Sequence, residues 1–193
     1  MKLKSFLVSV LVVAMSLVMA GCDEQQQNHD PVSKSVVAGS SADSSSSGIS
    51  RAGEKLENLT IKVYYPDENA TGLVAVEKSI KAAGQEKYKA AVEALMAGTD
   101  KKGLVNVFPK KSQLLQISLN GTTAQVDFNK SLAKDFVGGS TGEEMLVGSV
   151  VNTLTEFPEI KKVQILIDGK EVETISGHMD LSQPLARMEE LIK

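Results

Sequence analysis

The sequence predicts a folded domain of the α+β class. The predicted strands come in pairs, and the helices follow them without the regular strand–helix–strand alternation of a doubly wound α/β fold. A long helical pattern at residues 138–158 also leads directly into a hairpin pattern at residues 162–175. The predicted order is therefore strand, strand, helix, hairpin, helix, hairpin and closing helix.

The first 21 residues have the pattern of a secretory signal peptide. Lys2 and Lys4 precede an almost unbroken apolar run at residues 6–20, which is shorter than the roughly 20 residues of a membrane-spanning helix. Residues 19–22, Met-Ala-Gly-Cys, resemble the lipobox of bacterial lipoproteins, whose cysteine is diacylated and becomes the new N-terminus after cleavage. We therefore expect a lipid on Cys22 and attachment to the extracytoplasmic face of the cell membrane. The alternative is an ordinary cleaved signal peptide with a chance cysteine.

The cysteine count and the net charge exclude several classes of site. Cys22 is the only cysteine, so an internal disulfide and a thiolate metal cluster are excluded. Removal of residues 1–21 takes away two lysines and no acidic residue, which leaves 19 basic and 24 acidic residues and a net charge of −5. Because binding to phosphates needs a concentrated basic face, we expect no nucleic-acid partner.

Residues 22–55 are predicted to be the lipidated cysteine followed by a disordered tether. This stretch contains a glutamine run at residues 25–27 and a serine run at residues 44–47, with few large apolar side chains. Such a composition buries too little apolar surface to offset the entropy of ordering. A flexible tether of this length spans on the order of 30 Å. A single folded domain is then predicted for residues 56–193.

Two strands and a helix are predicted first within this domain. Residues 59–65 alternate in polarity and are rich in β-branched and aromatic side chains, and residues 73–78 have similar β character. Residues 86–97 carry apolar side chains at helical spacing, and Gly98 ends the pattern. The connection at residues 103–109 is expected to contribute three apolar side chains to the core, namely Leu104, Val107 and Phe108.

A hairpin and a short irregular segment follow. Residues 114–119 and 123–128 form the predicted strands, and Asn120-Gly121 between them is expected to supply the positive φ angles of a tight turn. Residues 129–136 are predicted to form a short helix or an irregular turn.

The helix at residues 138–158 is the most strongly predicted element. Ser140 and Glu143 have the spacing of a capping box, in which each side chain satisfies a free amide of the first turn. Pro158 cannot continue the helix. The apolar side chains recur at spacings of three and four and form a broad face that can pack on a sheet: Met145, Leu146, Val147, Val150, Val151, Leu154 and Phe157.

The last predicted elements are a second hairpin and a closing helix. Residues 162–167 have β character, Asp168-Gly169 is a strong turn signal, and residues 171–175 are the predicted return strand. Residues 181–193 are predicted to form the closing helix, with Pro184 in its first turn.

A family resemblance is carried by short motifs spread over residues 59–187. These motifs are Tyr64-Tyr65-Pro66-Asp67, Ala91-Val-Glu-Ala-Leu-Met-Ala-Gly98, Gly103-Leu104 with Pro109 following, Val126-Asp-Phe128, Gly138-Gly-Ser140, Val151-Asn-Thr-Leu-Thr-Glu-Phe-Pro158, Lys162-Val163, Asp168-Gly169 and Leu181-Ser-Gln-Pro-Leu185. Together they resemble the GerMN domain, whose family is named for a sporulation and spore germination lipoprotein.

The resemblance implies a small mixed sheet backed by two helices, similar to the ring-building motifs of envelope-spanning complexes. It also implies a connection with sporulation or germination, and other family members include lipoproteins that associate with membrane sensor kinases. No catalytic residue and no cofactor follow from it. The structural motif residues that it marks are Gly138, Gly139, Ser140, Asn152, Phe157 and Pro158.

The sequence contains no recognisable catalytic or metal-binding constellation. His29 lies in the tether and His178 in a polar turn, so the two histidines are not expected to share a site. A serine nucleophile would need a neighbouring base, and no nucleophile elbow is expected. Gly138-Gly139-Ser140 could bind an anion on free helix amides, but the lysine of a phosphate loop is missing and capping already explains Ser140. We expect no cofactor and no metal.

The remaining candidate side chains are given structural roles. Glu143 and Glu144 diverge by about 100° on a helix and are expected to be solvated carboxylates stabilised by the helix dipole. Turn aspartates that serve local hydrogen bonds are predicted at Asp127, Asp135 and Asp168. Methionines that fill the core are predicted at Met145, Met179 and Met188.

These observations favour a non-enzymatic interaction module tethered to the membrane. It would dock through a sheet edge or a helix face on an envelope protein complex or on copies of itself. The alternative is a lipoprotein that binds a small molecule or a cell-wall fragment, although an aromatic content of 4% with no tryptophan argues against sugar stacking. A hydrolase is the third hypothesis and has the least support.

Overall fold

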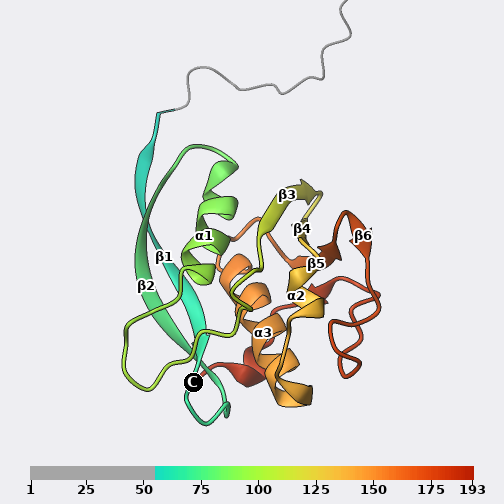
Figure 1. Cartoon of the computed structure of the whole chain (residues 1–193). Coiled ribbons are helices and arrows are strands. Elements are labelled where there is room, and N and C mark those ends of the chain that lie inside the picture. Colours follow the sequence, from blue (N-terminus) through green and yellow to red (C-terminus); the bar gives the residue numbers. More distant parts are fainter. Residues whose placement is uncertain (1–54) are drawn as a thin grey trace, which may run out of the picture. The chain divides into compact units, whose positions relative to one another are not determined.

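The computed structural model of the chain describes residues 55–193 (Figure 1). The predicted signal peptide at residues 1–21, the predicted lipid site Cys22 and nearly all of the predicted tether therefore lie outside the described residues. None of the helices within residues 55–193 combines the length and the apolar character needed to cross a membrane.

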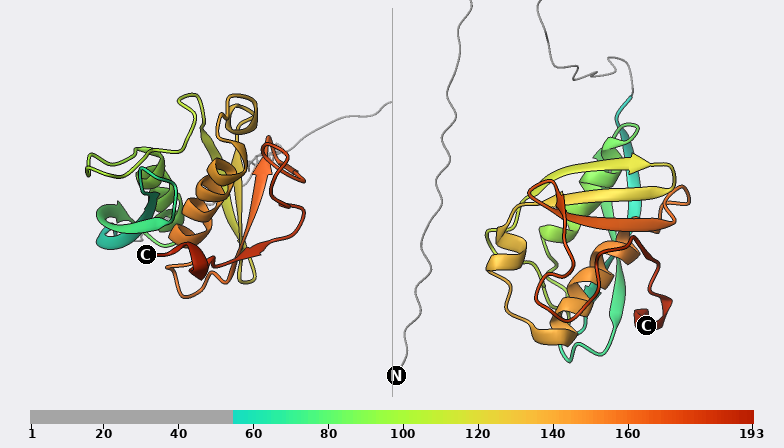
Figure 2. Two further views of the ribbon diagram at one scale, coloured as in Figure 1. Left: turned by 90° about the horizontal axis from the view of Figure 1, so that it is seen from below. Right: turned by 90° about the vertical axis from the view of Figure 1, so that its right-hand side faces the viewer.

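Two helices lie between a two-stranded hairpin and a second, larger sheet (Figure 2). The hairpin pairs β1 (Glu57–Pro66) with β2 (Leu73–Ala82) along their whole length. The two helices are α1 (Glu86–Met96) and α3 (Gly139–Leu154), which contact each other and both sheets. The predicted α+β class is confirmed, and so is the mixed sheet backed by two helices.

The larger sheet has the order β3-β4-β5-β6, with β7 also paired to β5. Its central strands β4 and β5 are parallel and the other pairs are antiparallel, which makes the sheet mixed. Parallel neighbours need a long crossover, and α2 (Ser131–Lys134) and α3 provide it here. The strands are β3 (Leu114–Asn120), β4 (Thr123–Phe128), β5 (Lys162–Ile167), β6 (Lys170–Glu171) and β7 (Leu185–Ala186).

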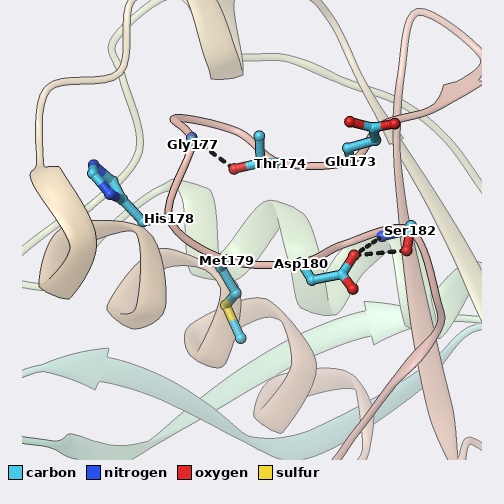
Figure 3. A pocket seen from close by; sticks show the side chains of 7 residues that line it. All are labelled: Glu173, Thr174, Gly177, His178, Met179, Asp180 and Ser182. Atoms are coloured by element: carbon cyan, nitrogen blue, oxygen red, sulfur yellow. Dashed lines mark hydrogen bonds between the residues drawn. The ribbon is translucent and has the colours of Figure 1, made fainter.

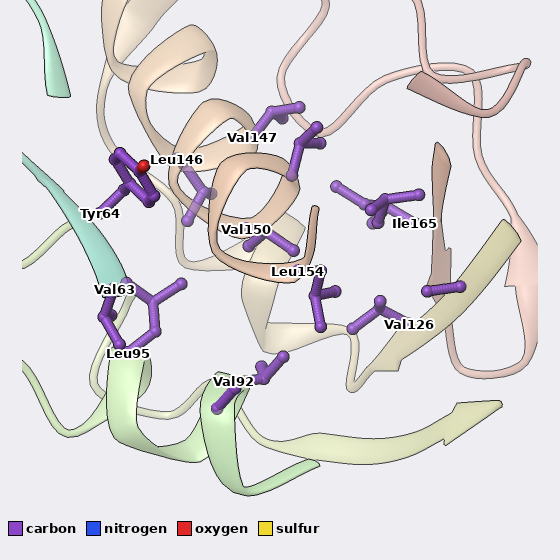
Figure 4. Packing of buried hydrophobic residues seen from close by; sticks show 14 of the residues in the cluster. Val63, Tyr64, Val92, Leu95, Val126, Leu146, Val147, Val150, Leu154 and Ile165 are labelled. Carbon is purple, nitrogen blue, oxygen red and sulfur yellow. The ribbon is translucent and has the colours of Figure 1, made fainter. Parts of the chain in front are cut away.

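Helix α3 forms the centre of the core. Every residue from Met145 to Leu154 is buried, so the helix is covered on all sides and not only along the predicted apolar face. Figure 4 shows its side chains Val150 and Leu154 packed among residues of β1, α1, β4 and β5. A helix that is buried all round occurs where elements cover it from opposite directions, which the hairpin and the larger sheet do here.

The two tight hairpin turns have different backbone geometries, although the sequence predicts the same kind of turn for both. Ile167 pairs with Lys170, and both turn residues, Asp168 and Gly169, have positive φ angles of 48° and 75°. This is the type I′ geometry that an Asp-Gly pair favours. In the other hairpin, Asn120 pairs with Thr123, so the turn is Gly121-Thr122 and only Gly121 has a positive φ, of 59°. The predicted placement of Asn120 in that turn is wrong by one residue.

The predicted return strand at residues 171–175 is wrong beyond its first residue. Strand β6 ends at Glu171. The backbone amides of Ile175, Ser176 and His178 donate to the side chain of Glu143 instead of to a neighbouring strand. A buried carboxylate therefore replaces the sheet as the hydrogen-bond partner of this segment.

The predicted closing helix at residues 181–193 is also wrong. The segment contains β7 and a short 3₁₀ turn, η1 (Glu189–Leu191). Strand β7 pairs with β5, and the side chain of Asn152 binds the backbone of Met188 on both its N–H and its C=O. These tertiary contacts hold the segment in an irregular path and outweigh its modest helix propensity.

Candidate functional site

The carboxylate of Glu143 is fully buried and organises the loop that follows β6. Its Oε1 accepts hydrogen bonds from the Thr174 hydroxyl at 2.6 Å and from the amides of Ile175 and Ser176 at 2.8 and 3.1 Å. Its Oε2 accepts from the Ser176 hydroxyl at 2.7 Å and from the His178 amide at 3.0 Å. The five donors surround one negative charge in the way that a binding site surrounds an anionic ligand.

These donors determine the protonation state of Glu143. Burial by itself raises the pKa of a carboxyl group, but the hydroxyls of Ser176 and Thr174 and the amides of Ser176 and Ile175 outweigh it and lower the pKa of Glu143 to about 2. The group is therefore anionic at physiological pH and has its lone pairs occupied. It is poorly suited to act as a general acid or a general base.

Two sequence-based expectations about this region are wrong. Helix α3 is capped by Gly138 without a side-chain hydrogen bond, and Ser140 is already its second residue. Ser140 therefore lies too far into the helix to cap it, and Glu143 turns inward instead of back to the first turn. Glu143 is not a solvated carboxylate either, although its neighbour Glu144 is exposed. The one sign in the sequence that Glu143 is buried is its position within the apolar stripe of the helix.

The stability of the domain should depend on pH through Glu143. Its pKa is lowered from 4.5 in the unfolded chain to about 2, so its stabilising contribution is complete above pH 4.5 and is lost as the pH falls toward 2. Urea unfolding at several pH values gives the free energy of unfolding as a function of pH. Between pH 2 and 4.5 this free energy should fall more steeply with decreasing pH in wild type than in Glu143→Gln, by up to about 1.4 kcal/mol per pH unit. Equal slopes in the two proteins over this window would contradict the assigned pKa.

Arg187 binds the C-terminal segment to the end of α3. Its Nη2 donates to the Tyr64 hydroxyl and to Glu156 Oε1, both at 2.7 Å, and the Tyr64 hydroxyl donates to the same Glu156 oxygen at 2.6 Å. Its Nη1 donates to the carbonyl of Asn152 at 3.1 Å. The guanidinium group also lies over the Tyr64 ring, 5.3 Å from its centroid. The cluster joins β1, α3 and the last segment.

The predicted motif residues lie at the two ends of α3 and do not form one site. Gly138, Gly139 and Ser140 are exposed at its start, and the helix of 16 residues extends about 24 Å from there. At its end, Asn152 is buried and donates from Nδ2 to the Met188 carbonyl at 3.0 Å, while its Oδ1 accepts from the Met188 amide at 2.8 Å.

The two remaining motif residues follow the helix. Phe157 is buried and packs edge-on against the ring of Tyr88, with 5.1 Å between the ring centroids. Pro158 is exposed directly after it. Their positions fit a role in ending α3 and directing the chain toward β5.

Residues 138–142 read Gly-Gly-Ser-Thr-Gly, which is the spacing of a nucleophile elbow. An elbow places its serine on a sharp turn from a strand into a helix. Here the preceding element is the short helix α2, and Ser140 lies inside the first turn of α3. No hydrogen bond joins the side chains of Ser140 and His178 in the described part of the chain, so the structure does not assemble a serine–histidine pair.

A hollow in the loop that Glu143 holds has a volume of about 470 Å³ and a lining of both polar and apolar atoms. Its lining includes the carboxylates of Glu173 and Asp180, and Figure 3 shows the His178 ring at the other end of the loop, away from both. Asp180 accepts from the amide and the hydroxyl of Ser182 at 2.9 and 2.6 Å, which lowers its pKa. Residues 55–193 contain no group of three side chains that could hold a metal ion.

A smaller hollow of about 240 Å³ has an apolar lining, and we call it the apolar groove. Three segments line it: the β1–β2 turn at residues 66–70, the connection at residues 105–107, and residues 136–145, which run from the α2–α3 connection into α3. Four large apolar side chains are exposed in the described domain, and two of them, Val105 and Val137, line this groove. Exposed apolar side chains gathered at a hollow are typical of contact surfaces.

Comparison with known proteins assigns the family. The model of the Germane family, described as "Sporulation and spore germination", matches residues 62–173, which is more than half of the chain. The chain belongs to the Germane family. The Germane domain is the GerMN domain that the sequence motifs resemble, so the predicted relationship is confirmed.

The relatives of this Germane chain include one curated protein and two solved structures. Spore germination protein GerM of Bacillus subtilis (strain 168) is 28% identical over 137 residues, which cover 66% of this chain and 36% of that protein. This chain therefore spans about a third of the length of that relative. The first GerMN domain of the sporulation protein GerM from Bacillus subtilis has a TM-score of 0.54 at 25% identity, with 67% of this chain and 98% of that domain covered.

The second structure contains the tandem GerMN domains of the same protein. It has a TM-score of 0.55 at 23% identity and covers 77% of this chain and 51% of the tandem structure. At that level of identity the likeness shows the Germane fold alone.

Proposed function

We propose that this chain is a lipoprotein tethered to the extracytoplasmic face of the cell membrane, whose Germane domain acts as a non-enzymatic protein-interaction module in the cell envelope. The supporting observation is the contrast between Glu143 and Val137. Glu143 is buried, and both of its carboxylate oxygens accept hydrogen bonds from within the fold. Val137, in contrast, is 96% exposed beside the apolar groove. The buried carboxylate of Glu143 thus has a structural role, whereas the surface at Val137 offers apolar contact.

The biological setting that we propose is sporulation or germination. The family description and the relationship to spore germination protein GerM support this setting. The lipobox-like ending at Cys22 and the polar stretch after it support attachment through a lipid and a tether. Two acyl chains give lasting attachment to a membrane, where a single chain is marginal.

The test of this function uses a strain in which the gene is disrupted and then restored as wild type or as Cys22→Ala. We expect the wild-type chain to incorporate labelled palmitate, to sediment with membranes and to restore sporulation or germination. Cys22→Ala should lose the label and at least nine-tenths of the membrane-bound protein, because it lacks the acylated sulfur. Ser35→Ala in the predicted tether is the matched control and should behave as wild type.

Two results would contradict the proposal. One is an unmodified Cys22 thiol on a chain that is released into the medium and still restores the phenotype. The other is turnover of a substrate by the purified chain.

A further inference from the structure

We propose that two copies of this chain pair face to face through the apolar groove, with Val137 of each copy inserted into the groove of the other. The inference rests on the proposed function and names its partner as a second copy of this chain. It is motivated by a projecting apolar side chain and a matching hollow that belong to the same patch of surface.

Val137 lies between Phe136 and Gly138, which are packed closely against each other, and its own side chain projects. A Cβ atom at Gly138 would lie only 2.4 Å from Cζ of Phe136, so the Phe136 ring occupies the space that a side chain at residue 138 would fill. Phe136 is half-buried and packs against the core, while the next residue, Val137, is left almost fully exposed. The groove thus has a half-buried aromatic side chain in its wall and an exposed valine beside it.

Charged side chains of both signs that have no ion-pair partner among residues 55–193 lie in the groove lining and next to it along the chain. Glu68 lies on the β1–β2 turn and lines the groove. Lys130 and Lys134 lie at the two ends of α2, and Lys134 and Asp135 directly precede Phe136, the first groove residue of the α2–α3 connection. The other acidic residue of the turn, Asp67, is already paired with Lys193. The turn therefore presents one free negative charge, and the α2 side presents a net positive charge.

A two-fold axis makes these features complementary. An axis that passes between the β1–β2 turn and the α2–α3 connection places the turn of each copy against the α2–α3 connection of the other. Val137 then faces the apolar lining of the opposite groove, and Glu68 faces Lys134. Because one patch supplies both the projection and the hollow, a single surface is enough for a closed pair.

The size of the patch indicates a weak pair. Twelve residues line the groove, compared with the roughly 20–30 residues a side of a standard stable interface. Attachment of both copies to one membrane raises their effective concentration and favours pairing there. The pair is therefore expected on membranes and at high protein concentration in solution.

The experiment uses the full chain with its lipid, as equal parts of ¹⁴N-labelled and ¹⁵N-labelled protein in lipid vesicles. A carbodiimide joins a carboxylate to an amine only where the two are in contact. We expect mass spectrometry to find a Glu68–Lys134 cross-link with one peptide of each isotope, which identifies a contact between copies. Val137→Asp should lower the yield of this mixed cross-link at least tenfold, because it places a charge in the opposite groove.

A charge exchange tests the proposed orientation. Glu68→Lys alone and Lys134→Glu alone should each lower the fraction of paired chain severalfold in sedimentation equilibrium. The double variant with both substitutions should restore pairing, because the two opposite charges then simply change places. All these side chains are exposed, so the circular dichroism spectrum and the unfolding midpoint should stay as in wild type.

The control is Leu115→Asp, which alters another exposed apolar side chain, on the edge strand β3 and outside the groove. It should leave pairing through the groove unchanged. The proposal is overturned if no mixed cross-link forms and the chain stays monomeric, or if Leu115→Asp abolishes pairing and Val137→Asp does not. A wild-type chain that does not pair but shows normal palmitate labelling and phenotype would remove this inference and leave the proposed function standing.

Discussion

Replacing Glu143 with alanine is expected to lower the free energy of unfolding by about 3–5 kcal/mol. The substitution removes one acceptor group and leaves three amides and two hydroxyls without their partner, with the Ile175 amide fully buried and the other four donors partly buried. Urea unfolding followed by circular dichroism measures the loss. Hydrogen exchange should locate it, with faster exchange at the amides of Ile175, Ser176 and His178.

The neighbouring carboxylate is the matched control for this prediction. Glu144 lies on the same helix but is exposed, so Glu144→Ala should change the free energy of unfolding by no more than about 0.5 kcal/mol. Glu143→Gln should fall between the two, because the amide keeps one oxygen acceptor but directs an N–H group at other donors. An unfolding free energy of Glu143→Ala within about 1 kcal/mol of wild type would show that the loop holds its shape without the carboxylate.

Replacing Asn152 with alanine is expected to cost about 2–4 kcal/mol. The side chain is fully buried and satisfies both backbone groups of Met188, so its loss leaves an amide and a carbonyl unpaired and creates a small cavity. We expect the C-terminal segment to loosen first, because the Asn152 side chain holds its backbone directly on α3. Faster hydrogen exchange at the Met188 amide would report this loosening.

An exposed asparagine on β1 provides the comparison for Asn152. Asn58→Ala should change the free energy of unfolding by no more than about 0.5 kcal/mol, since the Asn58 side chain is exposed and makes no hydrogen bond within the described domain. If Asn152→Ala and Asn58→Ala unfold at the same urea concentration, the C-terminal segment is held mainly by Arg187 and its apolar contacts.

The elements that the sequence predicted correctly are those with local signals. Strand β1 has alternating polarity and β-branched residues, α1 has apolar residues at helical spacing with Gly98 after it, and the turn at Asp168-Gly169 follows from the residues in the turn itself. Each of these signals is complete within a few residues. The α+β class follows from the order of such elements and needs no long-range information.

The errors arose where a distant partner decides the local structure. Residues 171–175 have the character of a strand, but the amide of Ile175 at their end binds a carboxylate 32 positions earlier in the chain. The segment around Met188 is held by Asn152, which is 36 positions away. The apolar groove was missed for the same reason, because its three lining segments are far apart in the sequence. No local pattern around Val137 shows that it faces a hollow.

The position of β1 has a mechanical consequence for a domain held by its amino-terminal end. The first described strand starts at Glu57, next to the predicted tether, and runs for ten residues, or about 33 Å, to the turn that borders the groove. It is paired with β2 over this entire length, from Glu57 with Ala82 to Pro66 with Leu73. Tension between the proposed membrane anchor and a partner at the groove would act along the strand axis, parallel to the two strands, and would therefore not peel them apart one hydrogen bond at a time.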